Sequence, residues 1–266
     1  MLHYLYFIIC LFEIINATSI KDENDIINTL INNTSGIVTL DINSEIDISK
    51  EIKIKSSIKK LSIIGNSLDS SKLYLKYPLY FDPNLKEIEI RRININGKLF
   101  FKNNEIITLS SVNLNGYIDS DFFNDNNNNS LIISNFNYKP TEESVENCIN
   151  LSGNVKIDNS NFYGNSSCRN RLLHYNGYDK YTLDLKDSYF NGEYECPFLN
   201  IENALNAIIE TSNFEKGYSS KDIDGGYKKL KKEKNYYWLV FIIIIIIINN
   251  FYPYVFFLLY TIFFFL

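Results

Sequence analysis

The stretch Val155-Lys156-Ile157-Asp158-Asn159-Ser160-Asn161-Phe162-Tyr163-Gly164-Asn165 decides the fold, because versions of it return along the chain. Each version has a short apolar alternation, a polar step of Ser or Asn, one large apolar residue, and a turn with Gly or Asn. The other versions lie at residues 88–97, 107–116, 131–138, 183–192 and 207–217. A string that recurs in this way predicts an architecture of repeated units.

The spacing of the repeats favours a solenoid. One large apolar residue marks each repeat, and these markers are Ile95, Leu114, Phe136, Phe162, Phe190 and Phe214. Intervals of roughly 20 to 30 residues suit a coil in which each repeat is one turn and stacks on its neighbours. The period of two excludes helical pairs, and the consensus line of a leucine-rich horseshoe is not reproduced. Antiparallel hairpins in a sandwich stay open as an alternative.

The segment before the repeats predicts a helix and then strands. Residues 22–30 place Ile26, Ile27 and Leu30 at helical spacing behind an acidic first turn. From Ile37 to Gly65 the apolar period becomes two, and residues 73–81 form another strand region in which Pro78 indicates a bend or an edge. Within the opening stretch, we expect Ile157 and Phe162 in the core and Gly164-Asn165 in a turn.

The helix, residues 37–65 and the IxIxxSxFxG strings resemble the right-handed parallel β-helix superfamily typified by pectin and pectate lyases. The resemblance covers residues 22–220, and within the superfamily the chain resembles the non-catalytic secreted or surface members. It implies an all-β, right-handed parallel β-helix solenoid in which a short N-terminal helix plugs the open end of the coil. It also implies that Ile and Phe stack inside and that Asn and Gly occupy turns able to take positive φ.

The beginning of the chain resembles a signal peptide. An apolar run at residues 4–15 precedes Asn16-Ala17-Thr18, whose small residue suits cleavage, so residues 1–17 are the predicted signal. Glu13 within the run, and the absence of Lys or Arg before it, leave a buried strand or an uncleaved anchor as alternatives. A signal peptide would send residues 18–220, the predicted β-helix domain, into the secretory pathway.

The last residues predict attachment to a membrane. Residues 236–266 are long and apolar enough to span a bilayer, although Asn249, Asn250 and Pro253 interrupt them. The lysines within the linker, residues 221–235, would by the positive-inside tendency lie in the cytoplasm, against the signal peptide. A cleaved lipid-anchor signal with Asp224-Gly225-Gly226 as its attachment site reconciles the two. Either attachment places the repeats outside the cell or in a lumen.

Acceptor sites and cysteines suit that compartment. The glycosylation pattern Asn-x-Ser/Thr occurs at Asn32, Asn33, Asn128, Asn150 and Asn165. Cys148, Cys168 and Cys196 are separated by about one repeat, so neighbouring turns can bring two of them within disulfide range and leave the third over. His3 and His174 are too few to support a zinc site, and no metal or cofactor is predicted. The net charge of −5 gives no general attraction to nucleic acid.

No catalytic set stands out in the sequence. The polysaccharide-cleaving enzymes that the chain resembles use clustered carboxylates with Arg, Lys or His on an exposed sheet. The candidates here are Asp119, Asp121, Asp184, Asp187, Arg91, Arg92 and His174. The adjacent Asp-Asp, Asn-x-Asp and Gly-His-Gly strings of polygalacturonases are missing as a set. Solvated outward faces explain the carboxylates, and a surface or packing role explains His174.

We therefore predict a membrane-tethered extracellular β-helix that acts as a non-catalytic surface module for adhesion or for binding glycans or proteins. The alternative is a polysaccharide lyase or glycoside hydrolase of the same fold. The alternative requires two or three of the candidate carboxylates to converge with Arg, Lys or His on one face. Any binding site is expected in the segments that interrupt the repeats, residues 119–129, 139–147 and 168–180.

Overall fold

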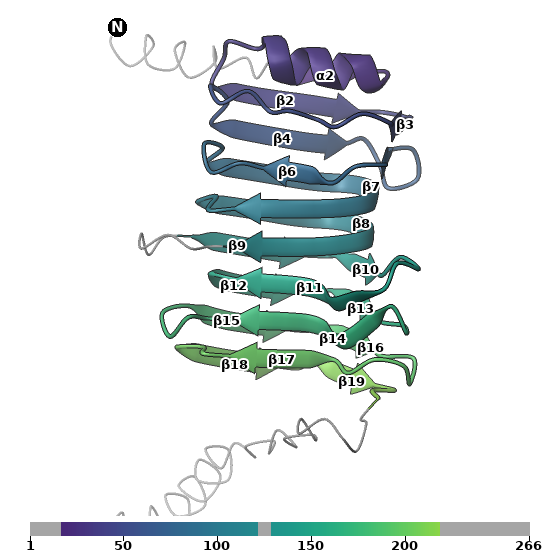
Figure 1. The fold of residues 1–266 in the computed structure, drawn as a ribbon, viewed down its shortest axis with the longest axis vertical. Coiled ribbons are helices and arrows are strands. Elements are labelled where there is room, and N and C mark those ends of the chain that lie inside the picture. Colours follow the sequence, from purple (N-terminus) through teal and green to yellow (C-terminus); the bar gives the residue numbers. More distant parts are fainter. Residues whose placement is uncertain (1–16, 122–128, 219–266) are drawn as a thin grey trace, which may run out of the picture. The chain divides into compact units, whose positions relative to one another are not determined.

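The computed structural model describes residues 17–121 and 129–218 of the 266-residue chain (Figure 1). These residues form a parallel β-solenoid of about eight turns with one short N-terminal helix, which confirms the predicted all-β solenoid and its capping helix. Asn128, most of the predicted signal, the linker and the predicted span at residues 236–266 lie outside this part. Within it, no helix is long and apolar enough to cross a bilayer.

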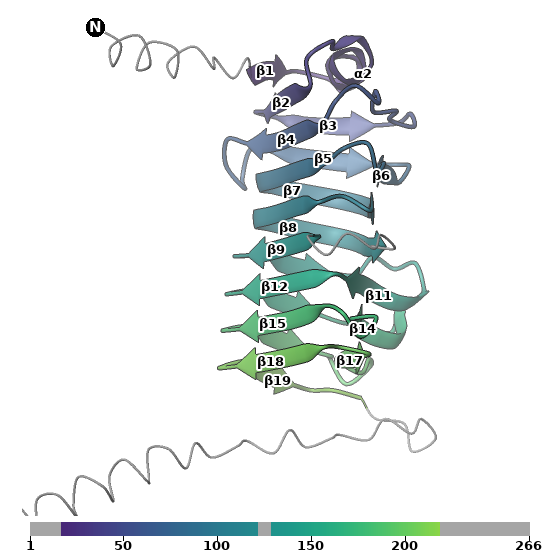
Figure 2. The same ribbon diagram turned by 90° about the vertical axis from the view of Figure 1, so that its left-hand side faces the viewer.

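The solenoid has three faces, each a ladder of parallel strands (Figures 1 and 2). The first face contains β1 (Ala17–Ile20), β2 (Ile37–Ile42), β4 (Lys60–Gly65), β9 (Ser130–Ser134), β12 (Asn154–Asp158), β15 (Thr182–Lys186) and β18 (Asn206–Glu210). The second contains β3 (Glu45–Ile48), β5 (Lys72–Leu75), β10 (Asn137–Lys139), β13 (Asn161–Tyr163), β16 (Tyr189–Asn191) and β19 (Asn213–Glu215). The third contains β6 (Leu79–Phe81), β11 (Val145–Ser152), β14 (Cys168–Asn176) and β17 (Leu199–Glu202). The long strands β7 (Glu87–Lys102) and β8 (Ile106–Asp121) bend through all three faces.

The register of these ladders gives the length of one turn. Equivalent residues on neighbouring turns are 19 residues apart at Lys86 and Glu105 and 28 apart at Ser160 and Ser188. One predicted marker was wrong: Tyr138, not Phe136, pairs with Leu114 on one side and Phe162 on the other. Phe136 and Tyr138 are both buried aromatic residues of this repeat, so the sequence pattern does not distinguish which one occupies the marker position.

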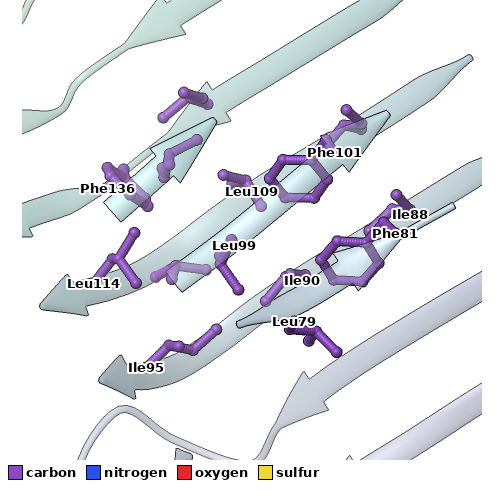
Figure 3. Close-up of a cluster of buried hydrophobic side chains, with 14 of the residues drawn as sticks. Leu79, Phe81, Ile88, Ile90, Ile95, Leu99, Phe101, Leu109, Leu114 and Phe136 are labelled. Carbon is purple, nitrogen blue, oxygen red and sulfur yellow. The ribbon is translucent and has the colours of Figure 1, made fainter. Parts of the chain in front are cut away.

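The interior is filled by columns of like side chains, as the repeat predicts. Ile157 and Phe162 are both fully buried. Phe162 stacks on Phe190 with ring centroids 4.6 Å apart, and Phe81 stacks on Phe101 at 4.8 Å (Figure 3). Each such residue contributes roughly 1.5–3 kcal/mol through burial, so the alternation alone explains the repeat.

A left-handed residue forms the corner between the first and second faces. It occupies the same place in six turns, at Arg92, Ser111, Asn135, Asn159, Asp187 and Thr211, with φ between 45° and 54°. The side chain of Asn159 donates from Nδ2 to Oδ1 of Asn135 at 2.6 Å, so the corners are linked from turn to turn. The opening stretch is thus two strands, β12 and β13, joined by a corner at Asn159 that the sequence did not indicate.

The helix α2 (Glu23–Asn32) covers the N-terminal end of the coil (Figure 1). Asp22 caps it by accepting a hydrogen bond from the amide of Asp25 at 3.0 Å. Ile26 and Leu30 are buried, whereas Ile27 is only partly buried. Glu23 accepts hydrogen bonds from the amides of Ser49 and Lys50, at 2.6 and 2.7 Å, and so ties the helix to the loop after β3.

One disulfide joins neighbouring turns, between Cys148 of β11 and Cys168 of β14. Among the described residues, Cys196 is the free cysteine, and its thiol is buried. Burial raises the pKa of this thiol to about 12, so it stays protonated at neutral pH.

Candidate functional site

A groove of about 470 Å³ lies on the outer side of the third face. One outward row of side chains runs along it, because each strand there pairs in parallel with the next and presents alternate residues to solvent. In register order this row is Tyr80, Phe100, Asp119, Asn150, His174 and Asn200. The first five line the groove, so the row joins an aromatic end to a polar end.

The aromatic end of the row is partly exposed. The rings of Tyr80 and Phe100 are stacked with centroids 5.0 Å apart, and Tyr80 is 41% exposed. Tyr117 follows at 5.4 Å from Phe100 in a tilted arrangement. The pair gives a ligand partly exposed apolar ring surface at this end of the groove.

The centre of the row is a fixed hydrogen-bond network. The Tyr117 hydroxyl donates to Oδ2 of Asp119 at 3.0 Å and accepts from Nδ2 of Asn150 at 2.7 Å. Burial, and then the negative charge of Asp119, raise the pKa of Tyr117, so the phenol remains a donor at neutral pH. The network leaves Asp119 as a charged acceptor whose orientation is set by its neighbours.

His174 lies at the polar end of the groove. Its Nδ1 is 3.1 Å from Nδ2 of Asn200, which also donates to Oε1 of Glu202 at 2.7 Å. Because an amide nitrogen donates, Nδ1 is the acceptor and a neutral His174 carries its proton on Nε2. His174 and Asp119 are each one strand away from Asn150, which separates them by roughly 10 Å along the ladder.

The other catalytic candidates lie elsewhere. Arg91 and Asp184 are on the first face, where Arg91 pairs with Glu89 at 3.3 Å and Asp184 with Lys186 at 3.7 Å. Arg92 and Asp187 are corner residues with positive φ. Asp121 ends β8, and its side chain lies outside the description. Of the described candidate side chains, the structure therefore brings only Asp119 and His174 to one groove.

Three acceptor asparagines are placed in contrasting surroundings. Asn33 and Asn165 form turns in which Oδ1 accepts from the amide two residues on, from Ser35 at 2.6 Å and from Ser167 at 2.9 Å. Asn150 lies within β11, where its amide is bound to Tyr117. The remaining one that the structure describes, Asn32, is exposed at the end of α2.

The sequence indicated part of this groove, because the expected segments 119–129 and 168–180 contain Asp119 and His174, whereas Tyr80, Phe100 and Asn150 lie outside them. Asp119, Asn150 and His174 are in strands β8, β11 and β14, which belong to a third face that the repeat string does not contain. Two signals were present: Tyr80 stands between the buried Leu79 and Phe81, and Phe100 between Leu99 and Phe101. In a period-two strand, an aromatic residue at such a place must face outward.

Within residues 17–121 and 129–218, no three His, Cys, Asp or Glu side chains lie close enough to hold a metal ion. Comparison of the chain with protein-family models, with curated proteins and with solved structures finds no match.

Proposed function

We propose that this protein is a non-catalytic surface module that binds glycans in the third-face groove. The observation that carries the proposal is the row in which the stacked Tyr80 and Phe100 lead into Asp119, Asn150 and His174. One face of a sugar ring is made of C–H groups and packs on an aromatic plane, while its hydroxyls require both donors and acceptors. The groove offers all three within one row.

The proposal includes an extracellular or lumenal location and a membrane tether. The Cys148–Cys168 disulfide supports an oxidising compartment. The turn at Asn33 presents its acceptor pattern at the surface, with Thr34 and Ser35 exposed. The tether itself rests on the apolar sequence of residues 236–266.

We further propose that the coil is right-handed and related to the pectin lyase-like β-helices. Parallel strands joined by crossovers are right-handed in nearly all known cases, because strands twist in one sense. The plugging helix adds support, since the resemblance implied it.

The alternative of a lyase or hydrolase keeps one favourable observation, which is that Asp119 and His174 line the same groove. A hydrolase of the usual kind requires a second carboxylate near the first. Incubation of the full chain with pectin and related polysaccharides tests this, with reducing sugars and unsaturated uronates as readouts. Activity above that of a boiled control would overturn the non-catalytic proposal.

Binding is tested by applying the full chain to an array of neutral and acidic glycans, with heat-denatured chain as the control. The proposal expects selective retention on glycans that present an exposed apolar ring face. Equal signals from native and denatured chain would contradict it.

A further inference from the structure

We propose that the second face carries another binding site, which takes an extended, uncharged, hydroxyl-rich polysaccharide chain. The site is a shallow groove of about 530 Å³ over β5, β7, β8, β10 and β13. It shares the long strands β7 and β8 with the third-face groove, but no side chain lines both grooves. The inference therefore stands independently of what the third-face groove binds.

The inner row of the second-face groove is a rigid ladder of asparagines. Asn161 donates from Nδ2 to Oδ1 of Asn137 at 2.8 Å, and Asn137 donates in the same way to Asn113 at 2.9 Å. These side chains are partly buried and hold one another from turn to turn. Their role in the fold is thereby explained, and they form a preorganised floor.

The outer row is not explained by the fold. Asn96 and Asn115 are directly paired in register, and both are exposed. Among the described residues, no hydrogen bond engages either side chain. The two amides lie side by side next to the bend at Gly97 and Gly116, and their exposed polar groups are available to a ligand. Each amide offers two donors and one acceptor, which matches a hydroxyl group.

Aromatic rings stand at both ends of the outer row. Tyr74 pairs in register with Asn96 and is 38% exposed. At the other end, Lys139 pairs with Asn115, and its Nζ lies 5.5 Å from the centre of the Tyr163 ring. The order along the face is therefore ring, amide, amide, ammonium, ring. Such an order can stack a sugar ring on Tyr74 and bind hydroxyls at the two amides and the ammonium beyond it.

The charges favour an uncharged ligand. The ammonium of Lys72 is bonded to Glu45, and that of Lys139 lies over the Tyr163 ring. Lys72 is thus paired with an acid, Lys139 keeps its charge at one end of the row, and the surface between them is made of neutral amides. An acidic chain would gain little there.

The strand spacing favours an extended chain along the solenoid axis. Neighbouring strands are roughly 4.8 Å apart, which is close to the advance of one sugar unit in an extended β-linked polysaccharide. Successive sugars would then meet successive amides.

The test is titration calorimetry of the full chain with two linear hexasaccharides, a neutral β-glucan and an acidic galacturonan. The double variant Asn96→Ala/Asn115→Ala is compared with Asn206→Ala, which removes an exposed asparagine on the first face. We expect the neutral chain to bind the wild type. It should bind the double variant about tenfold or more weakly, and it should bind Asn206→Ala as tightly as it binds the wild type. The double variant Tyr80→Ala/Phe100→Ala should bind it normally, which separates this site from the third-face groove. Failure of the neutral chain to bind, equal affinity of the double asparagine variant, or preference for galacturonan would overturn the inference.

Discussion

Gly97 and Gly116 pair in register on neighbouring turns, where β7 and β8 bend from the second face to the third. A Cβ on Gly116 would meet the carbonyl oxygen of Gly97 at 1.7 Å, which no side-chain movement relieves. We therefore expect Gly116→Ala to lower the free energy of unfolding by roughly 2–4 kcal/mol. The control is Gly36→Ala, because a Cβ there has its nearest neighbour at 3.9 Å. Denaturant titration of both variants measures the difference, and equal stability would contradict the close approach.

The corner residue Asn159, with φ of 45°, predicts a second stability difference. Asn159→Ala should lower stability by about 1–2 kcal/mol, because alanine is strained in the left-handed region and the link to Asn135 is lost. Asn159→Gly should cost less, since glycine adopts this conformation readily. If the alanine variant is as stable as the glycine variant, positive φ does not govern this corner.

The plugging helix should loosen in acid. Burial opposes ionisation of Glu23, but hydrogen bonds from the amides of Lys50 and Ser49 outweigh it and lower the pKa below its ordinary value of 4.5. A depressed pKa means that the stabilisation is present above that ordinary value and is lost as the pH falls through the folded-state value. The protection of the α2 amides, measured relative to their intrinsic exchange rate at each pH, should therefore decrease below pH 4.5. In Glu23→Gln this acid-dependent step should be absent, and its persistence would assign the step to another group.

The two kinds of cysteine should differ in chemistry. Replacing Cys148 and Cys168 by serine should lower stability by about 3 kcal/mol, as expected for a closed loop of this length. Cys196 should resist alkylation in the native protein, because its pKa is raised to about 12 and its side chain is buried. Mass spectrometry of the Cys196 peptide after treatment with iodoacetamide checks this. Rapid labelling of native protein would contradict the burial.

The sequence predicted the parts of the fold that repeat. Ile157 and Phe162 follow a period that burial alone imposes, so the strands and their inward faces could be recognised without a structure. The third face escaped prediction because its strands are joined by loops of different length, and no constant string spans them. For the same reason the marker Phe136 was chosen in place of Tyr138, since composition does not distinguish two buried aromatic residues in one turn.

The candidate site was predicted in part. Asp119 and His174 were named, but their convergence depends on the register of β8, β11 and β14, which no local pattern encodes. Arg92 and Asp187 were named for their charge, whereas the structure uses their positions as corners. Asn150 was predicted as a glycan acceptor, yet its amide is bonded to Tyr117 within the groove.

The central claim is that the stacked rings of Tyr80 and Phe100 form the floor of a sugar-binding groove. The most direct measurement is calorimetric titration of the full chain, with the glycan that the array selects, for the wild type and for Tyr80→Ala/Phe100→Ala. Tyr77→Ala is the matched control, because Tyr77 is 45% exposed and does not line the groove. We expect the double variant to bind about tenfold or more weakly and Tyr77→Ala to bind as the wild type does. Wild-type affinity in the double variant would contradict the account.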